Sequence, residues 1–223
     1  DSNKADGIIL LGYGDYHESR ERLQRLVEQG THFVRWGASL PDQPGVSIGS
    51  DNFQGGFDIT AHLLDQGCQR IAFIGHASSH YPEFEERYRG HVAAMAARGI
   101  HAEPGLQHDA ITTEQDGFDA CQALLARGEI VDGVFAASDL IAIGAMRALR
   151  EHGLRVPQDV ALAGFDDIPL AASVSPPLTT VQQDTKQAGQ LLVEKLLALI
   201  SGAPVDGQTI PVKHVLRESS RRR

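Results

Sequence analysis

Short β-rich apolar segments alternate with amphipathic helical segments along most of this 223-residue chain. The segments typical of strands are 7–11, 32–36, 46–49, 71–75, 132–137 and 159–164. Apolar residues at helical spacing predict helices around 23–27 and 59–64, and over 84–98, 115–127, 139–152 and 185–201. Such alternation predicts an α/β fold in which parallel strands are covered by helices on both faces.

Parallel sheets of this kind bind ligands at the carboxyl ends of their strands, where loops and helix N-termini converge. In this chain the loops that follow predicted strands begin at Gly75, at 137–139 and at 164–167. We therefore expect any ligand to contact residues of these three loops.

Composition excludes several classes of function. Twenty Lys and Arg residues against 29 Asp and Glu give a formal charge of −9, which disfavours contact with nucleic-acid phosphates. The one basic run, 221–223, is expected to be a frayed tail. No apolar run approaches the ~18 residues of a membrane span. The polar start of the chain also lacks the basic and apolar regions of a signal peptide.

The residues give no sign of a metal site, a cofactor site or a catalytic group. Cys68 and Cys121 are expected to be small buried thiols, and the ten histidines are scattered without metal-ligand spacing. The segment 12–14, Gly-Tyr-Gly, lacks the third glycine of a dinucleotide fingerprint. Asp166 and Asp167 are adjacent, so in an extended chain they would point in opposite directions and form no acid–base pair. Binding is therefore favoured over catalysis, and we expect no enzyme.

Three polar residues lie near predicted strand ends. Arg87, at the start of the helix over 84–98, offers a fork of donors to hydroxyls or carboxylates, although it could equally be a solvated surface arginine. Asp166 follows the strand over 159–164 and could bind a ligand or close a turn. Ser138 opens a helix, where an N-cap is the simpler interpretation.

These residues belong to a longer pattern that resembles the effector-binding core of LacI-GalR family transcriptional regulators. The matching segments are 6–10, 51–52 with 55–56 and 62–63, 70–75, 87–90, 138–146, 156–160, 164–167, 177–181 and 216–219. The family core normally has a strand, helix, strand and helix before the segment Asp-Gly-Ile-Ile-Leu, and these have no counterpart in this sequence.

The resemblance implies a periplasmic-binding-protein-like fold of two similar parallel-sheet subdomains. It implies that the first subdomain comprises 1–66 and 183–208, the second 67–182 and 209–218, and a tail 219–223. It further implies a small-molecule effector between the subdomains, held by Arg87, Asp166 and Ser138. Glu83 and Tyr13, on loops expected to face the pocket, are added to this set.

The function implied is that of a cytoplasmic, sugar-responsive repressor that binds operator DNA through a head domain absent from this sequence. The residues 109–111 lack the aromatic side chain of purine-responsive members, which favours a carbohydrate effector. A homodimer is expected because 140–149 and 170–177 are rich in apolar residues. Two alternatives stay open: a free sugar-binding protein of a transport system, and a sugar-converting enzyme.

Overall fold

A computed structural model describes residues 5–12, 14–40 and 43–222. The strands are β1 (Ile8–Leu11), β2 (Phe33–Trp36), β3 (Val46–Ser50), β4 (Ile71–Ile74), β5 (Gln107–His108), β6 (Gly133–Ala136), β7 (Ala161–Ala163), β8 (Thr180–Gln182), β9 (Gln208–Ile210) and β10 (Lys213–Val215). The α-helices are α1 (Tyr16–Glu28), α2 (Asn52–Asp65), α3 (Pro82–Ala97), α4 (Glu114–Ala126), α5 (Asp139–Glu151) and α6 (Thr185–Ile200). Short 3-10 turns are η1 (Pro104–Leu106), η2 (Pro169–Ala172) and η3 (Glu218–Ser220).

The chain divides into two compact units. Unit 1 comprises Asp1–Asp51, Ser79–Glu83 and Asp184–Pro211, and unit 2 comprises Asn52–Ser78, Phe84–Gln183 and Val212–Arg223. The alternation of strands and helices is confirmed, because each unit is built around a four-stranded parallel sheet.

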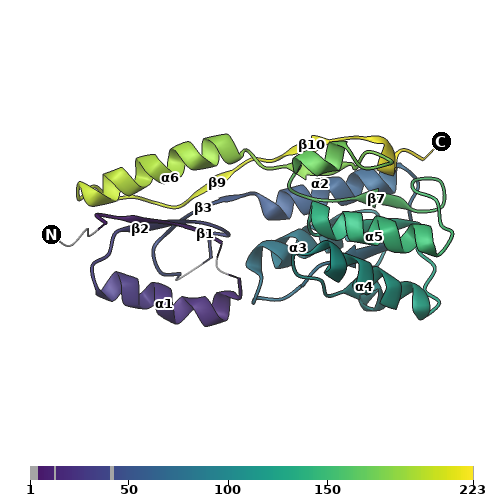
Figure 1. Ribbon diagram of the computed structural model, residues 1–223, viewed down its shortest axis with the longest axis horizontal. Coiled ribbons are helices and arrows are strands. Elements are labelled where there is room, and N and C mark those ends of the chain that lie inside the picture. The colour runs from purple at the N-terminus through teal and green to yellow at the C-terminus, as the bar shows by residue number, and fades with distance from the viewer. Residues whose placement is uncertain (1–4, 13, 41–42, 223) are drawn as a thin grey trace. The chain divides into compact units, whose positions relative to one another are not determined.

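Unit 1 has the strand order β1-β2-β3-β9, with Ile9 opposite Val34 and Ile48 opposite Gln208. Helices α1 and α6 lie on opposite faces of this sheet (Figure 1). One small core around Val34 and Leu192 lies under α6. A second core, formed by Tyr16, Leu23 and Phe33, lies under α1.

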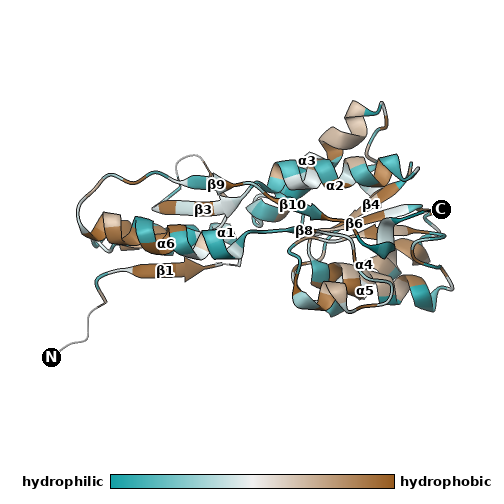
Figure 2. Cartoon of the chain, turned by 90° about the horizontal axis from the view of Figure 1, so that it is seen from above, coloured by the Kyte–Doolittle hydropathy of each residue, from teal (hydrophilic) through white to brown (hydrophobic). Residues whose placement is uncertain are grey.

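Unit 2 has the strand order β5-β4-β6-β7 and one continuous core. Helices α2 and α3 cover one face of the sheet and α4 and α5 cover the other (Figure 2). Two glycines let α4 and α5 approach closely, since a Cβ atom at Gly117 would lie 2.2 Å from the Ile141 carbonyl oxygen and one at Gly144 would lie 2.0 Å from that of Glu114. An additional antiparallel pair, β8 with β10, departs from the expected all-parallel arrangement.

The structure differs from the expected subdomain boundaries in two places. Helix α2 belongs to unit 2 rather than to the first subdomain, because its buried side chains Ile59, Leu63 and Leu64 join the core of unit 2. Strand β9 pairs with β3 in unit 1, so the segment after 208 does not belong wholly to the second subdomain.

The expected tail over 219–223 wrongly includes its first two residues, Ser219 and Ser220. Ser219 and Ser220 are fully buried, and the Ser219 hydroxyl donates to the Leu162 carbonyl oxygen at 2.7 Å. The hydroxyl also accepts a hydrogen bond from the Thr179 amide. These residues are therefore an integral part of unit 2. None of the described helices is long and apolar enough to cross a bilayer.

Candidate effector site

The polar residues of interest lie where β6 and β7 end in unit 2. Strand β6 leads through Ala137 to Ser138 and the start of α5, and β7 leads through Gly164 to Asp166. Neighbouring parallel strands β6 and β7 bring these two loops to the same edge of the sheet.

Arg87 reaches this edge because α2 and α3 cross at glycines. A Cβ atom at Gly56 would lie 2.2 Å from the Arg87 carbonyl oxygen, and one at Gly90 would lie 2.2 Å from that of Phe53. Any larger residue at either position would push the helices apart. The glycines of the segments 55–56 and 87–90 therefore fix the backbone from which the Arg87 side chain extends.

The Arg87 side chain is only 4% exposed and is held on several sides. Its Nε donates to Asn52 Oδ1 at 2.8 Å, and its Nη1 donates to the Ala137 carbonyl oxygen at 2.5 Å. The guanidinium stacks on the buried Phe165 ring, with 3.7 Å between Cζ and the ring centroid. Arg87 is therefore a buried, oriented arginine and not a solvated surface residue.

Asp166 faces this arginine. Its Oδ1 lies 3.7 Å from Arg87 Nη1 and accepts a hydrogen bond from Gln183 Nε2 at 2.7 Å. Burial raises the pKa of Asp166 above its usual value, and the nearby Arg87 charge and the Gln183 hydrogen bond oppose that rise. The structure thus brings together Arg87 and Asp166, the two main residues of the expected site.

Ser138 caps α5, since its hydroxyl accepts a hydrogen bond from the Ile141 amide at 3.3 Å. The N-cap interpretation is therefore confirmed. The adjacent Asp139, which belongs to the expected loop over 137–139, is fully buried. Its Oδ1 accepts from the Thr180 hydroxyl at 2.5 Å and its Oδ2 from the Ile168 amide at 2.9 Å.

Burial raises the pKa of Asp139 to about 7. The carboxylates of Asp166 and Asp167 raise it further, whereas the two hydrogen bonds that Asp139 accepts lower it. A carboxyl group that titrates near neutral pH therefore lies directly beside the loop that carries Asp166.

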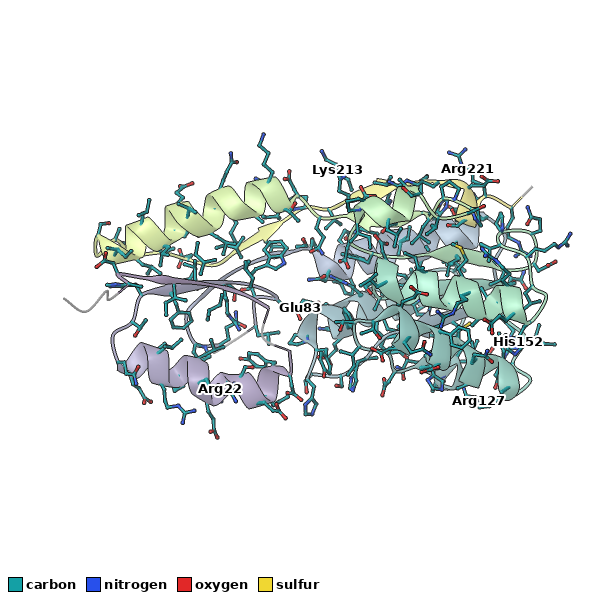
Figure 3. The ribbon with its side chains drawn as sticks, viewed as in Figure 1. Arg22, Glu83, Arg127, His152, Lys213 and Arg221 are labelled. Carbon is teal, nitrogen blue, oxygen red and sulfur yellow. The ribbon has the colours of Figure 1, made fainter. Side chains whose placement is uncertain are left out.

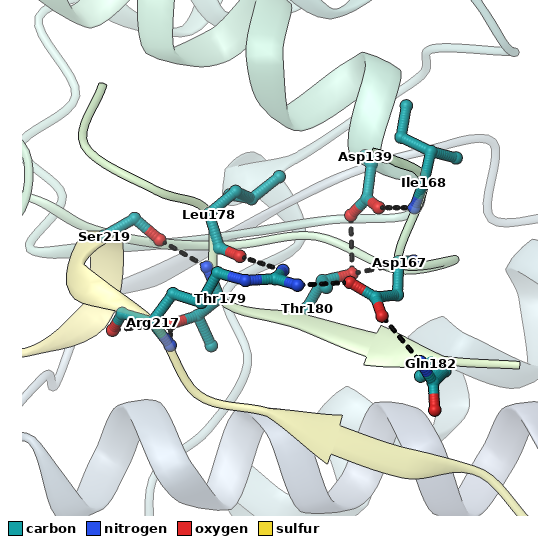
Figure 4. Close-up of polar contacts among 9 residues, drawn as sticks. All are labelled: Asp139, Asp167, Ile168, Leu178, Thr179, Thr180, Gln182, Arg217 and Ser219. Carbon is teal, nitrogen blue, oxygen red and sulfur yellow. Dashed lines mark hydrogen bonds and ion pairs between the residues drawn. The ribbon is translucent and has the colours of Figure 1, made fainter. Parts of the chain in front are cut away.

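Asp167 belongs to a second polar network that sequence reasoning missed (Figure 4). Its Oδ1 lies 2.7 Å from Arg217 Nη2, and its Oδ2 accepts from Gln182 Nε2 at 2.7 Å. Arg217 also donates through Nη1 to the Leu178 carbonyl oxygen at 2.8 Å. Two segments that match the family, 177–181 and 216–219, supply Leu178 and Arg217 to this network, but no contact between them and Asp167 was predicted.

Glu83, labelled in Figure 3, belongs to unit 1, where its Oε1 accepts from the Ala38 amide at 2.8 Å. Tyr13 lies outside the described residues.

A cavity of about 380 Å³ opens beside β5, at the segment 109–111 that lacks an aromatic side chain. Its lining residues are His76, His108, Asp109, Ala110, Ile111, Asp116, Asp119 and Ala120. Among the described residues, no group of three or more His, Cys, Asp or Glu side chains is placed to hold a metal ion.

The two cysteines offer no activated nucleophile. Cys68 and Cys121 are free and buried, as expected, and burial raises their pKa values to about 11 and about 12. Both are therefore thiols at neutral pH, the unreactive form.

Comparison with known proteins agrees with this architecture. Residues 60–220 match the periplasmic binding protein-like domain family. Over 95% of the chain, it is 35% identical to the HTH-type transcriptional regulator CelR of Thermobifida fusca, and over 96% it is 32% identical to the ribose operon repressor of Escherichia coli K12. The chain spans 60% and 64% of the lengths of these two relatives.

Solved structures give the same result. A complex of the transcriptional regulator CelR with cellobiose superposes with a TM-score of 0.90 at 32% identity, covering 98% of this chain and 67% of that one. A LacI-family regulator from Enterococcus faecium with bound ribose gives 0.83 at 26% identity, covering 96% of this chain and 79% of that one. The chain therefore belongs to the periplasmic binding protein-like family and, within it, to the effector-binding cores of LacI-family transcriptional regulators.

Proposed function

We propose that this chain is the effector-sensing core of a transcriptional repressor and that it binds a small carbohydrate where β6 and β7 end. The observation that carries the proposal is the juxtaposition of the buried Arg87 guanidinium with the Asp166 carboxyl group, 3.7 Å apart. Asp166 lies where β7 ends, and the Arg87 side chain reaches from α3 to the end of β6, the edge where parallel α/β sheets bind their ligands.

The chemistry of this pair suits a sugar. Each sugar hydroxyl is both a donor and an acceptor, so a guanidinium can donate to one hydroxyl while a carboxyl group accepts from its neighbour. The Ser138 hydroxyl, at the start of α5, is proposed as a third contact. Glu83 and Tyr13 remain weaker candidates.

The named relatives support the sugar class and the regulatory role. The solved CelR complex contains cellobiose and the Enterococcus faecium regulator contains ribose. For the whole protein we propose binding to operator DNA through a segment outside this chain, a cytoplasmic location, and regulation rather than catalysis. The sugar would shift the equilibrium between two conformations of the protein only if it bound one conformation more tightly than the other.

We further propose that the protein forms a homodimer through unit 2. Most of the apolar residues of 140–149 do not support this interface, because Ile141, Met146 and Leu149 of α5 are buried within the unit itself. Leu140 and Leu170 remain 39% and 46% exposed, and these side chains support a contact surface on α5 and η2.

Isothermal titration calorimetry with cellobiose and with ribose tests the proposed site. Arg87→Ala should weaken the affinity of whichever sugar binds by about tenfold to a hundredfold, since a charged hydrogen bond contributes roughly 1.5–3 kcal/mol. Arg89→Ala is the matched control, because Arg89 lies on the same helix but is exposed and paired with Glu86. Equal affinities in the parent, Arg87→Ala and Asp166→Asn would refute the site.

A further inference from the structure

The backbone at Asp166 and Asp167 has an unusual conformation. Their φ angles are 119° and 56°, and they are the non-glycine residues with positive φ among those the structure describes. Residues other than glycine rarely have positive φ angles, and they keep them only when contacts with the surrounding structure stabilise that conformation. The contacts that hold this segment therefore determine where the Asp166 carboxyl group points.

The ion pair between Asp167 and Arg217 is one of the contacts that stabilise this segment. Both oxygens of Asp167 are engaged, one by Arg217 and one by Gln182, each at 2.7 Å. The pair is largely buried, with the Arg217 side chain 20% exposed and that of Asp167 11% exposed. A paired carboxylate with both oxygens bonded has little freedom to turn.

Arg217 is itself fixed to the frame of unit 2. Its Nη1 donates to the Leu178 carbonyl oxygen at 2.8 Å, and its amide donates to the Thr179 hydroxyl oxygen at 2.8 Å. The following residue pair, 219–220, is anchored to the same threonine: Ser219 Oγ accepts from its amide, and Ser220 Oγ lies 2.7 Å from its Oγ1. The Arg217 guanidinium thus links Asp167 to the buried terminal segment, which fixes the position of the Asp167 side chain.

Two further hydrogen bonds stabilise the segment on either side of Asp167. The Asp166 amide donates to the Val181 carbonyl oxygen at 2.8 Å, and the Ile168 amide donates to Asp139 Oδ2 at 2.9 Å. These bonds fix the ends of the segment. Its middle is fixed by the Arg217 and Gln182 contacts of the Asp167 side chain and by the bond from the Asp167 amide to the Thr180 hydroxyl oxygen at 3.4 Å.

We infer that Arg217 is a positioning residue for the effector site. Through its ion pair with Asp167 it keeps the strained segment 166–167 in the conformation that places the Asp166 carboxyl group 3.7 Å from Arg87 Nη1. In this role Arg217 acts through Asp167. This inference rests on the proposed function, since it takes Asp166 as a contact for the sugar.

Two variants test this role, with Arg221→Ala as a matched control in the same terminal segment. Arg221 is exposed, and its side chain makes a long contact, 3.5 Å from Nη2 to the Leu216 carbonyl oxygen. Amide hydrogen exchange reports local opening, and calorimetry with cellobiose and with ribose reports affinity. In Arg217→Ala, exchange at residues 166–168 should accelerate about tenfold and affinity should fall about tenfold, while exchange in β4 stays unchanged.

Arg217→Lys should recover part of both losses, because an ammonium group can pair with Asp167 but lacks the planar fork that reaches Asp167 and Leu178 together. If Arg217→Ala does not fold, the lysine variant still shows the intermediate effect. Unchanged exchange at 166–168, faster exchange with unchanged affinity, or equal acceleration in β4 would each overturn the positioning role. If the parent binds neither sugar, the proposed function fails, and localised acceleration at 166–168 still supports the hold of Arg217 on the segment.

Discussion

The two units of this chain bury their side chains in different ways. Unit 2 has one continuous core on both faces of its sheet, and it also buries polar residues such as Asp139 and Thr179 completely. Unit 1 divides its apolar residues between two small cores. The unit that holds Arg87 and Asp166 is thus the one whose interior is continuous.

The difference indicates how the site is held in shape. A buried polar network whose members all have partners fixes side-chain geometry more tightly than apolar packing alone. In unit 2 such networks run from Asp139 to Thr180 and from Asp167 to Arg217, directly beneath the candidate site. We therefore expect unit 2 to be the more stable and the more rigid of the two.

The largest expected effect concerns the core of unit 2. Phe73 is 1% exposed and packs edge-on against Phe135, so Phe73→Ala should lower the free energy of unfolding of unit 2 by about 3–5 kcal/mol. Phe33, 3% exposed, is the matched position in unit 1. Phe33→Ala should destabilise unit 1 and leave the transition of unit 2 in place.

One residue makes this comparison measurable. The single tryptophan, Trp36, lies in β2 of unit 1, so its fluorescence follows unit 1 while far-ultraviolet circular dichroism follows both units. In urea, the fluorescence transition should come first and should shift only in Phe33→Ala. Coincident transitions that shift together in both variants would show that the two units unfold as one.

The buried Asp139 should make the stability of unit 2 depend on pH. Its pKa is about 7 in the folded protein, against an ordinary value of 3.8 for an aspartate side chain, so the folded state binds the proton more tightly. Stability should therefore fall as pH rises from about 4 to about 7, by at most about 4 kcal/mol for this group. Neighbouring Asp166 and Asp167 contribute to the same rise in the pKa of Asp139.

Asp139→Asn removes this titration and keeps a similar shape. In urea titrations at a series of pH values, the variant should show a flatter profile between pH 4 and pH 7 than the parent. Parallel profiles for the two proteins would mean that folding does not raise the pKa of Asp139.

A smaller effect is expected on self-association. Leu140→Lys places a charge on the exposed part of α5 and should weaken the proposed dimer at least about tenfold, or about 1.4 kcal/mol. Ile130→Lys, at a residue 77% exposed elsewhere in unit 2, controls for the added charge. Sedimentation velocity over a range of micromolar concentrations measures both, and a parent that stays monomeric throughout contradicts the proposal.

The smallest expected effect concerns the binding of DNA by this chain alone. With a formal charge of −9, the chain by itself should not retard operator-like DNA in a sequence-dependent manner. A gel-shift assay with a palindromic duplex and a scrambled duplex checks this. Tight retardation of only one of the two would assign DNA recognition to this chain.

Much of the fold could be predicted because local pattern determines it. Each of the predicted strands and helices has a counterpart within a few residues. The close approach of α2 and α3 at Gly56 and Gly90, which orients Arg87, was not predicted. The sheet to which α2 belongs could not be read from its apolar residues, because such a face fits either sheet.

The parts that were missed depend on contacts distant in sequence. The bond from Thr180 to Asp139 joins residues 41 positions apart, and that from Arg217 to Asp167 joins residues 50 apart. Asp166 and Asp167 were treated as extended chain, whereas positive φ angles give each its own set of partners. No local pattern of residue types distinguishes these two conformations for an Asp-Asp pair.

The most direct test of the proposed site is a nuclear magnetic resonance titration of the parent chain with cellobiose and with ribose. For the sugar that binds, the amide shifts should change most at residues 137–139 and 165–168 of unit 2. Shifts at the far end of the same unit, around residues 126–130, should stay constant. Saturable binding of either sugar with no change at 137–139 and 165–168 would contradict an effector site built on Arg87 and Asp166.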